Sequence, residues 1–363
     1  MSDPPESNPK TLDRRDFLRL GAAAGVGILA GGIAAAAPGP AGAEAAAPAG
    51  GAPWPLPHNP VTPGAMPMRN LGRTGYRVGI FSLGGQAAVE QPDNEAAAVA
   101  IVEKALDLGV NYVDTAAAYG GNERWSQRYI GQVMKRRRKE AFLTSKTHDR
   151  TRDGSLKLLE ESLRLLNTDH LDLWQVHNLS RMEQVDQIFA PGGAMAALHA
   201  ACEQKMVRFL GVTGHADPDV LIEAIRRFDF DTVLMALNAA DPHRLSFAEK
   251  LLPLAVEKRM GIIGMKIPAR GRILASWSPP PEDQQHDVEK PARAGTLQMR
   301  EALYYTLSHP VSTVIVGCDS PAQVEENVAL AQAFTPLSGG QLAALNARTE
   351  PVARQALFFR RWT

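Results

Sequence analysis

The chain has 363 residues, of which 45% are hydrophobic, so it is long enough to bury the core of a large single domain. Its 39 basic and 39 acidic residues cancel to a formal net charge of zero, which argues against a nucleic-acid or polyanion binder. The two cysteines, Cys202 and Cys318, are far apart, so neither a disulfide framework nor a cysteine-based metal site is expected.

The first 43 residues have the features of an export signal. Arg14-Arg15-Asp16-Phe17-Leu18 follows a polar head, an apolar run covers 20–37, and Ala41-Gly42-Ala43 has the small-x-small form of a cleavage site. We interpret this segment as a twin-arginine signal, which predicts passage through the twin-arginine translocase to the periplasm. The apolar run is rich in Gly and Ala, so a stable membrane span is not expected.

The mature chain is expected to begin with a Pro/Ala/Gly-rich linker over 44–66. A folded domain over 67–335 follows, and a C-terminal helix and tail occupy 336–363. The domain opens with a predicted β-hairpin, whose strands 68–72 and 76–78 are joined through Arg73-Thr74-Gly75.

Eight predicted strands then alternate with segments that have apolar residues at helical spacing. The strands are 80–83, 111–114, 141–146, 171–177, 208–213, 232–237, 261–266 and 313–316. This pattern predicts an α/β fold, a (β/α)8 TIM barrel with an N-terminal hairpin. A doubly wound open sheet is the alternative, but Leu83-Gly84-Gly85-Gln86 does not fit the glycine-rich phosphate turn that such a sheet needs after its first strand.

Three segments stand outside this alternation. The stretch 268–295 follows the seventh strand and is rich in Pro, Gly and charge, so we expect a long loop, and a lid, on the face of the strand ends. The tail Phe358-Phe359-Arg360-Arg361-Trp362 is expected either to wall a pocket or to pack on the surface. The basic run 135–139 falls where a helix should end, which favours a solvated helix terminus.

Four polar residues stand at or just after the ends of three consecutive strands. Asp114 ends the second strand and Tyr119 follows it, Lys146 ends the third strand, and His177 ends the fourth. Each alone has an ordinary structural explanation. A closed barrel would bring all four to its C-terminal face, where the active sites of such barrels lie.

The segment from about Met68 to Phe334 resembles an aldo/keto reductase. The matching motifs are Leu71-Gly72-Arg73-Thr74-Gly75, the 109–120 stretch, Thr144-Ser145-Lys146-Thr147, the 166–173 stretch with His177, and Gly317-Cys318-Asp319-Ser320-Pro321-Ala322-Gln323 with Glu326-Asn327. The resemblance implies a TIM barrel that reduces carbonyl compounds with a nicotinamide cofactor. It assigns the catalytic roles to Asp114, Tyr119, Lys146 and His177.

The chemistry gives each of these four a task. A free tyrosine, with a pKa of about 10, is a weak acid near neutrality. The Lys146 ammonium is expected to bring the pKa of Tyr119 closer to the working pH, and Asp114 to keep Lys146 charged and in place. His177 is expected to hydrogen-bond the carbonyl oxygen and to stabilise the developing alkoxide.

The resemblance also implies a cofactor site, with NADP(H) as the first expectation and NAD(H) as the alternative. It places the adenosine 2′-phosphate and adenine at Gly317, Ser320, Gln323 and Asn327, where Ser320 and Pro321 begin a helix. Well-studied members carry a Lys and an Arg where this chain has Gly317 and Gln323, which weakens the case for strong NADP(H) preference.

The nicotinamide end departs further from the usual pattern. Gly214 and Leu234 replace an Asn and a Gln that grip the carboxamide, and Met265 replaces the stacking Tyr, with a Met-Lys pair typical of a divergent branch of the family. Lys266 is expected either to reach the pyrophosphate or to be solvated. Thr213 is expected to contribute a polar contact to the cofactor, and Gln86 to line a polar substrate pocket.

The sequence therefore predicts an NADP(H)-dependent oxidoreductase that acts on a small aldehyde, ketone or sugar-like carbonyl. A cofactor-binding regulatory subunit with little turnover is the alternative that the altered cofactor contacts favour. An aldolase with a Schiff base on Lys146 is a third possibility, against which the Asp114 carboxylate argues.

Overall fold

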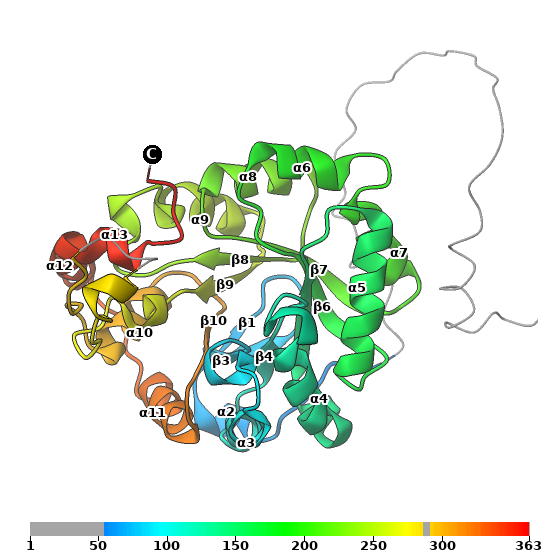
Figure 1. The fold of residues 1–363 in the computed structure, drawn as a ribbon, viewed down its shortest axis with the longest axis horizontal. Helices are drawn as coiled ribbons and strands as arrows, with labels where there is room; N and C mark the ends of the chain where they lie inside the picture. The colour runs from blue at the N-terminus through cyan, green and yellow to red at the C-terminus, as the bar shows by residue number, and fades with distance from the viewer. Residues whose placement is uncertain (1–53, 286–290, 363) are drawn as a thin grey trace, which may run out of the picture. The chain divides into compact units, whose positions relative to one another are not determined.

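The computed structural model describes residues 54–285 and 291–362, and the predicted export signal lies outside them. Within the described part, eight parallel strands close into a barrel in the order β10, β3, β4, β5, β6, β7, β8, β9. Figure 1 shows these strands at the centre of a ring of helices. The predicted TIM barrel is confirmed.

The barrel strands coincide closely with the predicted ones. They are β3 (Phe81–Gly84), β4 (Tyr112–Asp114), β5 (Phe142–Thr147), β6 (Leu171–Val176), β7 (Val207–Gly214), β8 (Thr232–Ala236), β9 (Gly261–Met265) and β10 (Thr313–Val316). Most are buried along their whole length, as expected for a parallel sheet covered on its outer face by helices.

Helices cover the outside of the barrel in chain order. They are α3 (Glu95–Asp107), α4 (Trp125–Arg137), α5 (Arg152–Leu165), α6 (Met182–Phe189), α7 (Ala194–Glu203), α8 (Pro218–Arg227), α9 (Phe247–Glu257), α10 (Met299–Leu307) and α11 (Pro321–Gln332), followed by α12 (Gly339–Thr349) and α13 (Ala353–Ala356). None of the helices in the described ranges is long and apolar enough to cross a membrane.

The predicted hairpin closes the N-terminal end of the barrel. Its strands β1 (Met68–Asn70) and β2 (Arg77–Gly79) are antiparallel. Leu71 and Tyr76, from the turn, join the buried cluster inside the barrel, where the Tyr76 ring stacks on Phe142 at 4.6 Å between centroids. A Cβ on Gly72 would lie 2.1 Å from the Gly261 backbone nitrogen, so the turn approaches β9 more closely than any other residue type would allow.

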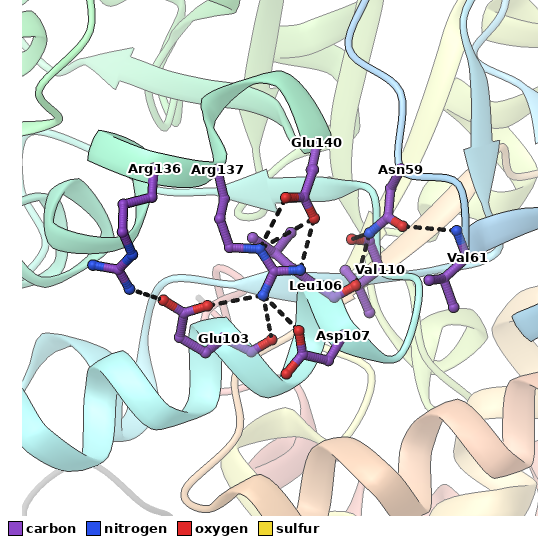
Figure 2. A network of polar contacts seen from close by, with 9 residues as sticks. All are labelled: Asn59, Val61, Glu103, Leu106, Asp107, Val110, Arg136, Arg137 and Glu140. Carbon is purple, nitrogen blue, oxygen red and sulfur yellow. Dashed lines mark hydrogen bonds and ion pairs between the residues drawn. The ribbon is translucent and has the colours of Figure 1, made fainter.

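The part of the predicted linker that the structure describes packs against this same end. Asn59 is only 2% exposed, and its amide donates to the Leu106 carbonyl at 2.7 Å while its side-chain oxygen accepts the Val61 N–H at 3.0 Å (Figure 2). The short helix α2 (Thr62–Ala65) follows. Residues 54–66 are therefore held by the barrel as far as the structure describes them.

The structure confirms that a helix ends within the basic run, where Lys135, Arg136 and Lys139 are exposed, but its two half-buried arginines form ion pairs that the sequence did not predict. Helix α4 does end within it, at Arg137, but Arg137 is only 18% exposed and forms ion pairs with Glu103 at 2.8 Å, Asp107 at 2.6 Å and Glu140 at 2.6 Å (Figure 2). Arg138 pairs with the fully buried Asp172 at 2.9 Å. Carboxylates of this chain already engage these arginines, because tertiary contacts bring acidic residues to them.

Candidate active site

The C-terminal ends of four strands surround a cavity of about 730 Å³. It lies between β3, β4, β9, β10 and the loop that follows β9, which contributes Pro268, Arg270, Gly271, Leu274, Ser276 and Trp277 to its wall. The long loop therefore lies on the face of the strand ends, as predicted. Eight of the predicted site residues line this cavity: Gln86, Asp114, Tyr119, Met265, Lys266, Gly317, Gln323 and Asn327.

Lys146 is at the centre of the hydrogen-bond network next to the cavity. Its side chain is 1% exposed, and its ammonium donates to Asp114 Oδ2 at 2.5 Å, to the Thr115 carbonyl at 2.9 Å and to the Tyr119 hydroxyl at 3.4 Å. An ammonium has three donors, so each has an acceptor. Asp114 is equally buried, and its other oxygen accepts from the Thr144 hydroxyl at 2.9 Å.

This arrangement keeps a buried charge pair beside the phenol. Burial lowers the pKa of Lys146, and the adjacent Asp114 carboxylate opposes that shift. The ammonium also lies 4.9 Å from the centroid of the Tyr119 ring, within cation–π range. Tyr119 is thus held between the lysine and the cavity.

The pKa of Tyr119 moves in the direction opposite to the sequence expectation. Burial raises it well above 10, and the negative charges of Asp114 and Glu90 raise it further, while Arg270 lowers it. The carboxylates of Asp114 and Glu90 therefore act against ionisation of the phenol. Tyr119 is consequently a protonated donor at neutral pH.

His177 lies next to Tyr119 but does not line the cavity. Its ring meets the Tyr119 ring edge to face, with 5.7 Å between centroids. Burial, and then the positive charge of Lys146, keep the pKa of His177 well below 6.5, so the imidazole is neutral at physiological pH. The structure therefore brings the four predicted polar residues together, with a neutral imidazole beside a protonated phenol.

The positions that depart from the family pattern at the nicotinamide end have structural reasons. A Cβ on Gly214 would lie 2.6 Å from the Leu179 carbonyl, so an asparagine does not fit there. Leu234 is 1% exposed and belongs to the barrel core. Thr213 is also 1% exposed, and its hydroxyl accepts the Asn178 N–H at 2.8 Å instead of lining the cavity. Met265 does line the cavity.

The start of helix α11 forms the other end of the cavity. Ser320 caps the helix by accepting the Gln323 N–H at 3.3 Å, and Pro321 stands in its first turn, as predicted. Gly317 packs closely against the turn after β3, because a Cβ there would lie 3.1 Å from the Gln86 carbonyl. The nearby lining residues Asp319, Gln323, Glu326 and Asn327 include two carboxylates and no cation.

Sequence reasoning missed Glu90 and Trp277, which also line the cavity. Glu90 ends the short 3-10 helix Ala87–Glu90 (η1) and accepts hydrogen bonds from the Gln86 amide at 3.2 and 3.4 Å. Lys266 donates to the other atom of that amide, Gln86 Oε1, at 3.5 Å. No local pattern marks Glu90 or Trp277, because the closed barrel alone brings them to the cavity.

The C-terminal tail docks beside the cavity without lining it. The Arg360 side chain is fully buried, pairs with Asp241 at 2.5 Å and donates to the His215 carbonyl at 2.5 Å. Phe359 packs against the barrel core and lies edge to face with the His215 ring, 5.5 Å between centroids. The tail therefore packs around the strand ends of β7 and β8, outside the cavity lining, and a buried ion pair between Arg360 and Asp241 holds it there.

The donor set of the cavity suits a dinucleotide cofactor. The cavity volume is within the range of ligand sites, the first turn of α11 contributes Gln323 to its lining, and Lys266 adds a positive charge. Burial, followed by the charge of Arg270, lowers the pKa of Lys266 to about 8, so it is largely protonated at neutral pH. Among the described residues, no cluster of three or more potential metal ligands is present.

Comparison with known proteins agrees with this geometry. The model of the aldo/keto reductase family matches residues 77–349. L-galactose dehydrogenase of Arabidopsis thaliana is 28% identical over 308 residues, covering 78% of this chain and 95% of the relative. D-threo-aldose 1-dehydrogenase of a Pseudomonas species is 25% identical over 291 residues, covering 65% of this chain and 84% of the relative.

A solved structure has the same fold. The holo form of an aldo-keto reductase from Bacillus halodurans matches with a TM-score of 0.63 and 23% identity, covering 78% of this chain and 97% of the other. With a family model that spans most of the barrel and relatives matched over most of their length, this chain belongs to the aldo/keto reductase family of NAD(P)H-dependent oxidoreductases.

Proposed function

We propose that this protein reduces a small aldehyde, ketone or sugar-like carbonyl, with Tyr119 as the general acid. The observation that carries the proposal is the Lys146 ammonium, whose three donors go to Asp114, the Thr115 carbonyl and the Tyr119 hydroxyl at the wall of the cavity. A nicotinamide dinucleotide supplies the hydride when bound. The residues of the chain then have to orient the carbonyl, exclude water and deliver a proton to its oxygen.

The protonated state of Tyr119 is the one that carbonyl reduction requires. Reduction needs a proton on the phenol, and the raised pKa keeps that proton in place. Oxidation needs the phenolate, which burial and the carboxylates of Asp114 and Glu90 disfavour. After Tyr119 gives up its proton to the forming alkoxide, Lys146 is the cation beside the phenolate.

We assign His177 to orientation of the carbonyl oxygen. Its imidazole is neutral, so one ring nitrogen carries a hydrogen and donates while the other accepts. A neutral donor stabilises a developing oxyanion without competing with Tyr119 for the role of proton source. Its position beside the Tyr119 ring supports this role.

The relatives support a sugar-like substrate as one member of the proposed class, since two of them are named for the oxidation of sugars. The preference for NADP(H) stays a prediction. The lining near α11 has the carboxylates Asp319 and Glu326 and no cation, so a 2′-phosphate gains little there. We therefore expect NADP(H) to bind less than about tenfold more tightly than NAD(H).

Export through the twin-arginine translocase to the periplasm is also a proposal, which rests on the Arg14-Arg15 motif and the segment that follows it. We propose the predicted boundaries with it, a signal over 1–43, a linker over 44–66, a barrel over 67–335 and a tail over 336–363. Replacing Arg14 and Arg15 with lysines should leave the protein in the cytoplasmic fraction. Unchanged periplasmic recovery of that variant would remove the export proposal.

The proposed reaction is tested by titrating the protein from Glu44 onward with NADPH and, separately, NADH, followed by a panel of small carbonyl compounds. We expect saturable binding of at least one cofactor, and oxidation of that cofactor when a carbonyl is added. Binding without turnover of any carbonyl would favour the regulatory-subunit alternative, for which the absent carboxamide contacts at Gly214 and Leu234 are the supporting observation.

A further inference from the structure

The cavity has a polar wall that the proposed reaction does not use. Gln86 and Glu90 face each other four residues apart at the start and end of η1, and both line the cavity together with Tyr119. Tyr119 and this wall therefore face the same enclosed space. Glu90 is half-buried, so a ligand that covers its carboxylate has to supply hydrogen-bond donors in place of water.

The orientation of the Gln86 amide is determined by its neighbours. The Lys266 ammonium can only donate, so the amide oxygen faces Lys266, at 3.5 Å. The Glu90 carboxylate can only accept, so the amide nitrogen faces Glu90, at 3.2 and 3.4 Å from its two oxygens. Among the described residues, Glu90 accepts hydrogen bonds from the Gln86 amide alone, and a carboxylate has room for about four.

The turn that carries these two residues is closely packed. Ala87 has a φ of 62°, a left-handed value that is uncommon for a residue with a side chain. Ala88 and Val89 anchor η1 in the core, at 8% and 0% exposure. On the other side of the turn, a Cβ on Gly317 would lie 3.1 Å from the Gln86 carbonyl oxygen, which is a tight contact. Because the packing holds Ala87 in this unfavourable backbone conformation, the Gln86 and Glu90 side chains are directed toward the cavity.

An apolar surface completes the wall. The Trp277 ring lies against Gly271, where a Cβ would come within 2.9 Å of the indole. The lining of this cavity includes Trp277 together with Gln86, Glu90 and Lys266. A cavity lined by an indole, a carboxylate and an amide suits a small molecule that has both C–H groups and hydroxyls.

We propose that Glu90, oriented by Gln86, is a specificity-determining residue that accepts a hydrogen bond from a substrate hydroxyl, so that the substrate is a polyhydroxylated carbonyl compound. This inference rests on the proposed function and names its substrate class. An alkyl chain in place of the hydroxyl leaves the carboxylate without that donor, so the cavity selects the hydroxylated substrate.

The test compares D-glyceraldehyde with propanal, which has the same chain length but lacks both hydroxyls. With the tighter-binding cofactor, we expect kcat/KM to favour glyceraldehyde by about ten- to a hundredfold, the value of a hydrogen bond to a charged group. Glu90→Met should reduce this ratio to below about threefold, mainly through the KM for glyceraldehyde. Glu90→Gln keeps an acceptor without the charge and should give an intermediate ratio.

Glu160→Gln is the matched control, because Glu160 is an exposed carboxylate on α5. Its ratio should equal that of the wild type. Each ratio is measured within one preparation, so partial loss of folded protein cancels. Equal turnover of both aldehydes by the wild type, or an unchanged ratio in Glu90→Met, would overturn the subsite alone. No turnover of either aldehyde with either cofactor would overturn the proposed function and the subsite with it.

Discussion

The buried ion pair between Arg360 and Asp241 predicts how strongly the C-terminal tail stabilises the barrel. Both side chains are fully buried, with 2.5 Å between an Arg360 guanidinium nitrogen and Asp241 Oδ1. Arg360 also donates to the carbonyls of His215 and Ala236. Arg360→Met removes all of these donors. The remaining Asp241 carboxylate keeps the Ser246 hydroxyl at 2.6 Å and two backbone N–H donors. We therefore expect a loss at the lower end of the range for breaking a buried pair, about 3 kcal/mol.

Urea-induced unfolding measures this loss, and Arg361→Met is the matched control. Arg361 pairs with Asp217 but is 52% exposed, so its removal should cost less than about 1 kcal/mol. In the double variant Arg360→Met/Asp241→Asn the uncompensated charge is gone, so its cost should be smaller than the sum of the single variants. A free energy of unfolding for Arg360→Met within about 1 kcal/mol of the Arg361→Met value would refute this reasoning.

Three further predictions concern the site. His177→Ala should lower kcat for reduction by about 10²- to 10³-fold. Because burial keeps the pKa of the imidazole well below 6.5, wild-type kcat should show no inflection between about pH 6 and 8. An inflection near pH 6.5 would mean that the histidine titrates. The Lys266 pKa of about 8 predicts that cofactor affinity falls as the pH rises through about 8, because the cation is lost. The same fall in cofactor affinity in the Lys266→Met variant would contradict this assignment. Alcohol oxidation should speed up continuously toward pH 10, because it needs the Tyr119 phenolate whose pKa lies well above 10, and a plateau below pH 9 would show that another group is the base.

Much of the fold could be predicted because its signals are local. Thr313–Val316 forms β10 within the predicted bounds, since a short β-branched run between turn residues has few other structures open to it. Asp114, Lys146 and His177 could be placed together without any contact being known, because parallel strands that close into a barrel deliver their ends to one face.

The features that could not be predicted depend on long-range contacts. Arg137 pairs with Glu103, which is 34 residues away, and Arg360 pairs with Asp241, which is 119 residues away, so no local pattern marks either pair. Glu90 resembles any helix-end glutamate in the sequence. The direction of the Tyr119 pKa was wrong for a related reason, because the expectation included the charge of Lys146 but not the burial and the two carboxylates that outweigh it.

The most direct test of the central claim compares the wild type with Tyr119→Phe in two measurements on the same samples. The first is cofactor affinity by fluorescence titration, and the second is single-turnover oxidation of the bound cofactor by D-glyceraldehyde or propanal. The substitution removes the hydroxyl that Lys146 contacts at 3.4 Å and leaves the ring beside His177. We predict a dissociation constant within about threefold of the wild type and a turnover rate lower by at least about 10²-fold. Turnover at the wild-type rate in Tyr119→Phe would contradict the account, because the proton would then come from another group.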